Sequence, residues 1–351
     1  MAGQRTRSGV LRVTASSHRG GSKGGDEHDG SIVVVSEADC RKHISRTDAF
    51  TAVEAVFGAM ARGDAYNFPV IREAIGHADA LYGFKSGFDK AGLALGLKSG
   101  GYWPGNMERG LTNHQSTVFL FDPDTGRLKA LVGGNYLTAV RTAAASAVSI
   151  AHLARKEAKV LGMVGAGHQA QFQLRAAVEQ REFERIVAWN AHPDMIPKLG
   201  EVAEELGLPF ESVTQEELGA QADVIISITS AHEPLMMADW VKPGTHIACM
   251  GTDTAGKQEM DPELFVRGGV FTDEIAQSIT LGEAQHAIKA GLIEESDITP
   301  LGAVINGTHP GRSSDDEITL FDGTGVGLQD LAVADVAARM AREQGAPTVS
   351  L

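Results

Sequence analysis

The sequence predicts an α/β protein that joins a doubly wound parallel sheet to a second, discontinuous α+β domain. Three observations predict this fold. Continuous apolar strands alternate with helical segments after residue 159, a glycine-rich turn at 165–170 follows the first of these strands, and short strands separated by turns fill residues 65–132. Buried strands that alternate with helices are typical of parallel sheets, whereas strands joined by short turns are typical of antiparallel ones.

The amino-terminal stretch 1–30 differs in composition from the rest of the chain. Gly, Ser, Arg and Lys dominate it, and no acidic residue precedes Asp26. This composition predicts a disordered tail. Its arginines also resemble those of a transit peptide, but the helical apolar face that such peptides need is poor here. We expect folded structure to begin at Ser31, with a strand over 31–35.

A helix and a group of short strands are expected next. Residues 48–62 carry apolar side chains on one helical face, with Asp48 as the expected cap. A PDTG turn at 123–126 separates the last two of the strands. These strands predict a mostly antiparallel sheet, and they lie at 66–73, 80–87, 93–101, 116–122 and 128–134.

The segment after residue 137 predicts the parallel sheet. A long helix over 138–155 leads into its strands, and a further helix is expected near 194–206; the strands lie at 160–164, 185–190, 210–213, 223–230, 245–251 and 268–273. A strand at 318–321 and a helix at 325–343 end the chain, and we expect both to pack on the first domain. The predicted domains are a tail at 1–30, a first domain formed by 31–137 and 308–351, and a parallel-sheet domain at 138–307.

The turn after the strand at 160–164 has the pattern of a dinucleotide-binding element. Gly165 permits a tight turn, Gly167 lets a pyrophosphate approach the backbone, and Ala170 is small where the helix packs on the strand. The free N–H groups at the helix start suit phosphates. Glycine turns also end strands for purely steric reasons, but here the strand and the helix on either side match the Rossmann-type fingerprint.

The composition excludes several classes of function. A net charge of −14 argues against nonspecific binding to nucleic acid, and no apolar run is long enough to span a membrane. Cys40 and Cys249 form no motif, so we expect reduced thiols and a cytoplasmic protein. The histidines lack metal-ligand spacing, so no metal is expected.

Six strings carry a resemblance that covers nearly everything after the tail: LGLKSGG, YLTAVRTAAASA, VGAGHQAQFQL, ADVIISITS, MGTDTAGKQEMDP and FDGTGVGLQDLA. They resemble the ornithine cyclodeaminase and mu-crystallin family. The strings GGYWPGN and NHQSTVFLFDPDTG resemble members that reduce iminosuccinate, a dicarboxylic imino acid, more closely than they resemble cyclodeaminases. The resemblance implies a homodimer with a Rossmann domain, a first domain for substrate binding and dimerisation, and hydride transfer between a nicotinamide and an imine carbon.

The resemblance also implies roles for individual residues. Arg72 and Arg141 match carboxylate-binding arginines, whose planar fork can donate two parallel hydrogen bonds. Lys98 matches an active-site lysine and Asp253 the catalytic aspartate, and either of these two is a candidate for moving the proton. Considered without the resemblance, Arg72 and Lys98 are equally well explained as outward-pointing charges on strands, and Asp253 as a turn residue.

A small imino or amino dicarboxylate is the expected ligand, and its second carboxylate needs further polar contacts. We single out His114 for this contact, in a polar cluster with Tyr102, Asn106, Asn113 and Gln115. Two alternatives remain open. One is ornithine cyclodeamination or another ketimine reduction on the same fold, and the other is a noncatalytic, crystallin-like nicotinamide-binding protein.

Cofactor contacts are expected at the carboxyl ends of the parallel strands. NAD sites usually carry Asp or Glu after the second strand and NADP sites an Arg nearby. This chain has Asn190 and His192 there, which favours NAD, used as NADH, without excluding NADP. The expected cofactor-binding residues are Thr142, Gly165, Gly167, His168, Gln169, Asn190, Thr229, Ser230, Gly251, Asp253, Thr324, Gly325 and Val326.

Overall fold

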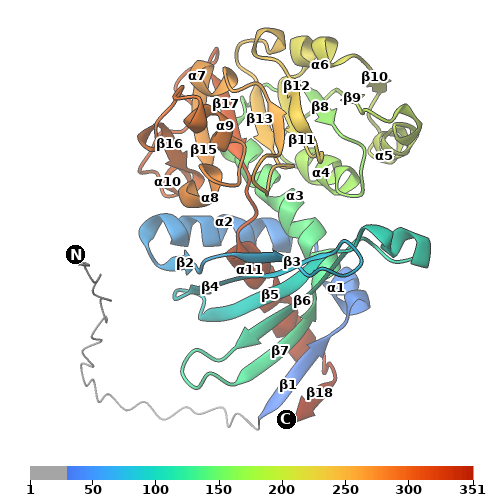
Figure 1. Cartoon of the computed structure of the whole chain (residues 1–351), viewed down its shortest axis with the longest axis vertical. Helices are drawn as coiled ribbons and strands as arrows, with labels where there is room; N and C mark the ends of the chain where they lie inside the picture. Colours follow the sequence, from blue (N-terminus) through green and yellow to red (C-terminus); the bar gives the residue numbers. More distant parts are fainter. Residues whose placement is uncertain (1–29, 351) are drawn as a thin grey trace, which may run out of the picture.

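The computed structural model describes residues 30–350, so nearly all of the predicted tail lies outside the described residues. Figure 1 shows two lobes, each built around one large sheet, with helix α3 (Gly134–Leu153) passing from one lobe to the other. Within residues 30–350, no helix is both long and apolar enough to cross a lipid bilayer.

The first lobe contains an eight-stranded sheet that is mostly antiparallel, as predicted. Within it, β1 and β7 run parallel to each other, and the other neighbours run antiparallel. In spatial order the strands are β18 (Thr348–Ser350), β1 (Ser31–Val35), β7 (Leu128–Gly133), β6 (His114–Phe121), β5 (Ala94–Tyr102), β4 (Leu81–Asp89) and β2 (Ala65–Asn67), with β3 (Ile71–Ala74) also paired to β4.

Helix α11 (Gly327–Glu343) lies across this sheet and contacts most of its strands (Figure 1). Two glycines make room for it. A Cβ atom at Gly87 would lie 3.1 Å from the Leu328 side chain, and one at Gly96 would lie 2.9 Å from the Leu331 side chain. The carboxyl-terminal helix therefore packs on the first domain, as predicted.

Helix α2 (Arg46–Arg62) begins two residues before its predicted start, and its cap differs from the prediction. Ser45 is the N-cap, and its hydroxyl accepts a hydrogen bond from the Asp48 N–H at 3.1 Å. The Asp48 carboxylate accepts one from the Ser45 N–H at 3.0 Å. Asp48 is thus the third helical residue of a capping box rather than the cap itself. The same arrangement starts α1 (Glu37–His43), which the sequence analysis did not predict.

The second lobe contains an eight-stranded sheet in which all neighbours are parallel. The chain runs outward from the central β8 and then returns to β11 on the other side of β8, and such a reversal is where open parallel sheets bind ligands. In spatial order the strands are β10 (Phe210–Ser212), β9 (Arg185–Trp189), β8 (Val160–Val164), β11 (Val224–Ser227), β13 (His246–Cys249), β17 (Ile318–Asp322), β15 (Gly268–Thr272) and β16 (Ile298–Pro300).

Short helices and a two-stranded sheet complete this lobe. The small sheet pairs β12 (His232–Met236) with β14 (Gln258–Met260). The helices are α4 (Ala170–Ala177), α5 (Pro197–Glu205), α6 (Gln215–Gln221), α7 (Leu264–Arg267), α8 (Ile275–Ser278), α9 (Ala284–Lys289) and α10 (Leu301–Ile305).

The predicted domain boundary at residue 308 is wrong for β17. The sequence analysis placed 308–351 entirely in the first domain, but β17 pairs with β13 on one side and β15 on the other, inside the parallel sheet. All five residues of β17 are buried, which suits a strand covered on both faces. The chain therefore crosses back to the first lobe only after Asp322.

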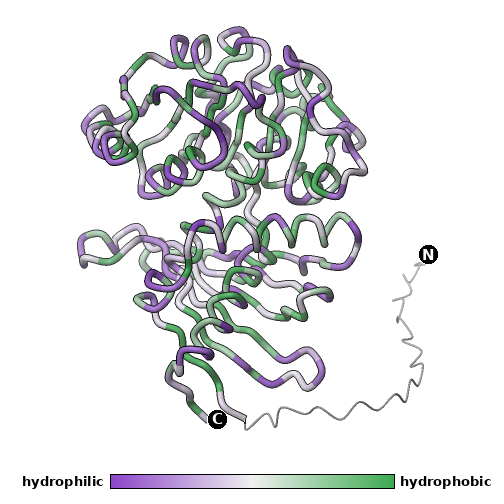
Figure 2. The backbone as a smooth tube through the Cα atoms, turned by 180° about the vertical axis from the view of Figure 1, so that it is seen from behind, coloured by the Kyte–Doolittle hydropathy of each residue, from purple (hydrophilic) through white to green (hydrophobic). Residues whose placement is uncertain are grey.

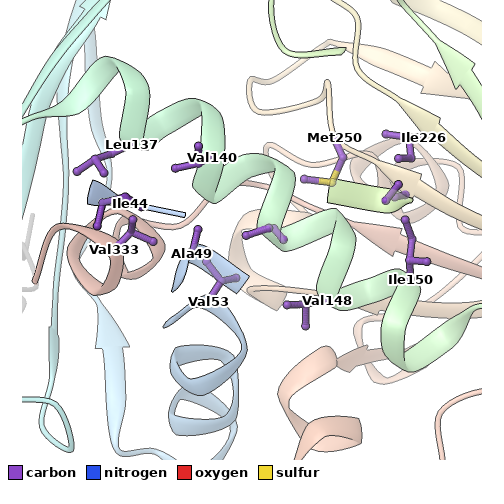
Figure 3. Packing of buried hydrophobic residues seen from close by; sticks show 14 of the residues in the cluster. Ile44, Ala49, Val53, Leu137, Val140, Val148, Ile150, Ile226, Met250 and Val333 are labelled. Carbon is purple, nitrogen blue, oxygen red and sulfur yellow. The ribbon is translucent and has the colours of Figure 1, made fainter. Parts of the chain in front are cut away.

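Helix α3 links the two lobes through a shared core. It starts at Gly134 rather than at residue 138, and most of its residues are buried. In Figure 3 its side chains Leu137 and Val140 lie near α2 and α11, whereas Ile150 lies near Ile226 of the parallel sheet. Figure 2 shows that the outer turns of both lobes are mostly hydrophilic. The apolar contacts along α3 thus fix one lobe against the other.

Candidate active site

A cleft of about 1010 Å³ lies between the two lobes. The parallel sheet contributes the carboxyl ends of β8, β9, β11, β13 and β17, and the first lobe contributes β3–β6 and α3. Pockets for small ligands typically measure about 300–1,000 Å³, so this cleft lies at the upper end of that range. It is at the reversal point of the parallel sheet, where ligand binding is expected.

The glycine turn after β8 fits the phosphates of a dinucleotide. Gly165 has a φ angle of +108°, and a Cβ there would lie 2.8 Å from the Ile228 carbonyl oxygen. A Cβ at Gly167 would meet nothing within 4 Å, so open space lies beside this backbone. The buried Gln169 Oε1 atom has no hydrogen-bond partner among residues 30–350. The open backbone at the turn suits phosphates, whereas the unused Gln169 oxygen can only accept a hydrogen bond and therefore suits a ribose hydroxyl.

The loop after β9 carries neither an acidic residue nor an arginine at the expected ribose position. Asn190 Oδ1 accepts a hydrogen bond from the Ala166 N–H at 3.1 Å, and its Nδ2 donates to the His192 carbonyl at 2.8 Å. The Asn190 side chain therefore holds this loop to the glycine turn, rather than pointing both polar atoms at a ligand.

Buried carboxylates hold the ends of the parallel strands. Glu259 accepts hydrogen bonds from the Thr229 N–H at 2.6 Å, after β11, and from the Gly251 N–H at 2.9 Å, after β13. Glu283 accepts from the N–H groups of Glu259 at 2.9 Å and Met260 at 2.8 Å. Burial, with help from the charge of Glu259, raises the pKa of Glu283 to about 8.

The same pattern continues toward β17. Asp322 accepts a hydrogen bond from the Glu283 N–H at 3.0 Å, and burial raises the pKa of Asp322 to about 7. Asp273 accepts from the N–H groups of Thr324 at 3.1 Å and Gly325 at 2.9 Å. None of these four acids lines the cleft, so they shape its wall from behind. The sequence analysis missed them.

Buried cations face the cleft from the first lobe. Arg141 on α3 is 6% exposed, and it donates from Nε to Asp330 at 3.0 Å and from Nη1 to Gln329 at 3.0 Å. Lys98 Nζ on β5 lies 2.8 Å from the other oxygen of Asp330. Burial works to raise the pKa of Asp330, but the charges of Arg141 and Lys98 outweigh it and keep that pKa below its usual value.

Lys98 titrates near neutral pH. Burial lowers the pKa of Lys98 to about 7; the charge of Asp330 opposes this shift, and the charges of Arg141 and Lys85 add to it. Lys85 lies directly opposite Lys98 in the β4–β5 register, and its Nζ donates to the Gly325 carbonyl at 2.6 Å. The sequence analysis missed Lys85, although the strand pairing of two neighbouring KSG strings was a usable signal.

Asp253 follows β13 and faces these cations across the cleft. Its Oδ1 lies 2.8 Å from Lys257 Nζ, and its Oδ2 lies 3.5 Å from Arg72 Nη1. Arg72 also donates to the Thr254 hydroxyl at 2.8 Å, so it joins the two lobes. Burial works to raise the pKa of Asp253, but the charges of Lys257, Lys85 and Arg72 hold it well below its usual range. Asp253 is therefore a carboxylate at neutral pH.

The predicted polar cluster around His114 is only partly in the cleft. The His114 ring lies 5.1 Å from the Tyr102 ring, measured between centroids, and both residues line the cleft with Asn113 and Gln115. Asn106 does not. It is 5% exposed and donates to the Thr112 carbonyl, so its role is to hold a loop.

Sixteen of the seventeen predicted site residues line the same cleft. The exception is Val326, which is fully buried at the start of α11 and packs in the hydrophobic core. The sixteen are Arg72, Lys98, His114, Arg141, Thr142, Gly165, Gly167, His168, Gln169, Asn190, Thr229, Ser230, Gly251, Asp253, Thr324 and Gly325.

Comparison with known proteins identifies relatives along most of the chain. The ornithine cyclodeaminase/mu-crystallin family model matches residues 31–345. The iminosuccinate reductase of Paracoccus denitrificans is 62% identical over 90% of this chain and 98% of its own length. The alanine dehydrogenase of Archaeoglobus fulgidus is 33% identical over 87% of this chain and 93% of its own length.

A solved structure agrees with these matches. The crystal structure of the Paracoccus denitrificans iminosuccinate reductase in complex with NAD⁺ superposes with a TM-score of 0.89 at 61% identity, covering 92% of this chain and all of the other. The predicted fold class and the predicted family are both confirmed. The chain belongs to the ornithine cyclodeaminase/mu-crystallin family.

Proposed function

We propose that this protein reduces iminosuccinate to aspartate with NADH. The observation that carries the proposal is the 62% identity, over 90% of the chain, with an iminosuccinate reductase. A cleft that carries several cations on the side facing the dinucleotide-binding turn supports it independently, because a dicarboxylate is a doubly negative ligand.

In this proposal the glycine turn and the strand ends hold the dinucleotide. The backbone at Gly165 and Gly167 would hold the pyrophosphate, and the unused Gln169 oxygen would accept a hydrogen bond from a ribose hydroxyl. Glu259 holds Thr229 and Gly251 in place. The bound nicotinamide supplies the hydride. NADH is the preferred form because no arginine or lysine follows β9 through Met195 to pair with the 2′-phosphate of NADPH.

The same proposal gives the substrate to the cations of the first lobe. Arg141 binds the carboxylate next to the imine, because Asp330 and Gln329 fix its Nε and Nη1 and leave Nη2 for the ligand. Arg72 and His114 line the same cleft and would contact the rest of the substrate. Fixed donors of this kind cost little reorganisation when the substrate binds.

Lys98 is the proton donor in this mechanism, and Asp253 stabilises the positive charge of the protonated imine. A pKa of about 7 lets Lys98 carry a proton and release it near neutral pH. Asp253 has no proton to give at that pH, since its pKa is held well below the usual range. Hydride addition at carbon and protonation at nitrogen together convert the C=N bond into the amine of aspartate.

We further propose that the protein acts as a cytoplasmic homodimer. Large apolar side chains are exposed on the first lobe around the β3–β4 edge and η1 (Pro104–Arg109), as a dimer interface requires. The two cysteines are buried and unpaired, which fits a reducing compartment. The exposed apolar side chains are Tyr66, Phe68, Ile75 and Leu111, together with Ile71, Phe84 and Met107, which also line the cleft.

Oxidation of NADH and NADPH with oxaloacetate and ammonium, which form iminosuccinate in solution, tests the proposal. We expect NADH-dependent formation of aspartate, little rate with NADPH, and none with oxaloacetate alone. Arg141→Ala should lower kcat/KM by about 100-fold or more, because the charge-assisted hydrogen bond from Nη2 to the carboxylate and the positive charge beside it are both lost. Arg339→Ala is the matched control, since its side chain is 64% exposed.

Ornithine is the substrate of the main alternative. It carries a second ammonium group, which would enter a cleft that already holds Lys85, Lys98 and Lys257. Like charges at close range disfavour that binding. Formation of proline and ammonia from ornithine, with no aspartate from iminosuccinate, would replace the proposal with cyclodeamination. Tight NADH binding without turnover of any imine would replace it with a noncatalytic role.

A further inference from the structure

We propose that Lys85 binds the second carboxylate of a dicarboxylic imino acid and thereby makes the site prefer substrates with two carboxylates over substrates with one. This inference rests on the proposed function and extends it to a residue that the sequence analysis did not single out.

The charge balance leaves Lys85 without a counter-ion. Asp330 is shared by Lys98 and Arg141, at 2.8 Å and 3.0 Å. Asp253 is shared by Lys257 and Arg72, at 2.8 Å and 3.5 Å. Among the described residues no carboxylate oxygen lies within 4.0 Å of Lys85 Nζ, and its hydrogen bond is to the neutral Gly325 carbonyl.

The strand register places Lys85 beside Lys98. The two residues are direct partners across the antiparallel β4–β5 pair, so their side chains leave the same face of the sheet. The Cβ atoms of such partners are about 4.5–5.5 Å apart, and like charges in this position destabilise a sheet. A sheet that accepts this cost at its ligand cleft gains two adjacent ammonium groups there.

The Cβ spacing of such a strand pair, about 4.5–5.5 Å, is close to the distance between the two carboxylates of the substrate. The carboxylate carbons of an extended four-carbon diacid lie roughly 4 Å apart by standard bond lengths. Arg141 and Lys98 face one carboxylate, and Lys85 lies where a second would neutralise the remaining charge. Burial lowers the pKa of Lys85, and charges from both ion-pair groups, those of Asp253 and Arg72 and those of Asp330 and Arg141, also act on it.

Calorimetric titration of the NAD⁺-bound protein with succinate and with propanoate tests the inference. The two probes share one carboxylate, and only succinate has the second. We compare the wild type with Lys85→Met, with Lys85→Arg as the charge-conserving variant, and with Lys90→Met as the matched control. Lys90 is exposed just beyond β4 and lies over the Tyr66 ring, away from the cleft.

We expect Lys85→Met to weaken the binding of succinate about 10- to 100-fold and to change the affinity for propanoate by less than about threefold. Lys85→Arg should restore most of the loss, and Lys90→Met should bind both probes as the wild type does. In turnover, the KM for iminosuccinate should rise in Lys85→Met by a similar factor, with a smaller change in kcat.

Equal weakening of both probes in Lys85→Met would overturn the inference, because Lys85 would then bind the shared carboxylate. Unchanged succinate binding would overturn it as well. A wild type that makes no aspartate from iminosuccinate, but whose preference for succinate is lost in Lys85→Met, would refute the proposed function and leave the dicarboxylate site standing.

Discussion

The two walls of the cleft bury charge in opposite ways. The parallel-sheet wall buries acids, and Glu259, Glu283 and Asp322 all accept hydrogen bonds from backbone N–H groups behind the surface. The other wall carries Lys85, Lys98 and Arg141 with their charged ends at the cleft. Buried charge that is satisfied by backbone builds shape, whereas buried charge that faces a cavity is available to a ligand.

The largest expected effect concerns the cationic wall. Lys98→Met should lower kcat for iminosuccinate reduction by about 10²–10⁴-fold, the usual contribution of a proton donor. The midpoint of thermal unfolding should change little, because Asp330 keeps its bond to Arg141. Steady-state kinetics and calorimetry measure both quantities, with the exposed Lys156→Met as control. Full activity in Lys98→Met would show that Lys98 is not the proton donor and that its buried charge has no catalytic role.

A substitution in the acidic wall should lower stability more than it lowers activity. In Glu259→Gln the amide N–H₂ group meets a backbone N–H donor, so the free energy of unfolding should fall by about 3 kcal/mol. Urea unfolding measures this, with the exposed Glu211→Gln as the control expected to change stability by less than about 0.5 kcal/mol. If Glu259→Gln kept its stability but lost catalysis, Glu259 would belong with the functional charges.

A pH profile sharpens the comparison further. Reduction needs protonated Lys98, so kcat at saturating substrates should fall about tenfold per pH unit as the pH rises through the Lys98 pKa of about 7. The reverse reaction, oxidation of aspartate, needs the neutral Lys98 amine to accept a proton. The kcat of this oxidation should therefore rise as the pH rises through about 7. The charge of Asp330 raises this pKa, so in Asp330→Asn the inflection should move to lower pH. If the pH profile of the Lys98→Met variant kept the same inflection, the inflection would belong to another titrating group.

Much of the fold could be predicted because its signals are local. The apolar strands of the parallel sheet, the glycine turn and the helices α2 and α11 each show in a short window of sequence. The partner of a strand is not a local property. The segment at 318–321 has the same apolar character wherever it pairs, so the sequence could not tell that β17 enters the middle of the other lobe.

The site residues also divide into those that show in a short window of sequence and those that only the strand pairing reveals. Arg72, Lys98, Arg141 and Asp253 carry recognisable neighbours in the sequence, and the structure brings all four to one cleft. Lys85 lies in a similar string, but only the register with Lys98 shows that it faces the cleft.

The acids of the wall were missed for a different reason. Glu259, in the segment QEM, has the alternating pattern of an exposed strand residue, and only its buried backbone partners reveal that it holds the wall.

The position of β17 has a consequence for synthesis on the ribosome. Translation delivers β13, β15 and β16 before β17, yet β15 reaches β13 only through β17. Until residue 322 has left the ribosomal exit tunnel, the strand that joins β13 to β15 is missing, so the parallel sheet cannot be completed. Helix α11, which covers the first lobe, follows β17 closely, so the segment from Ile318 onward completes both lobes. No amino-terminal fragment that ends before Gly325 can form the whole cleft.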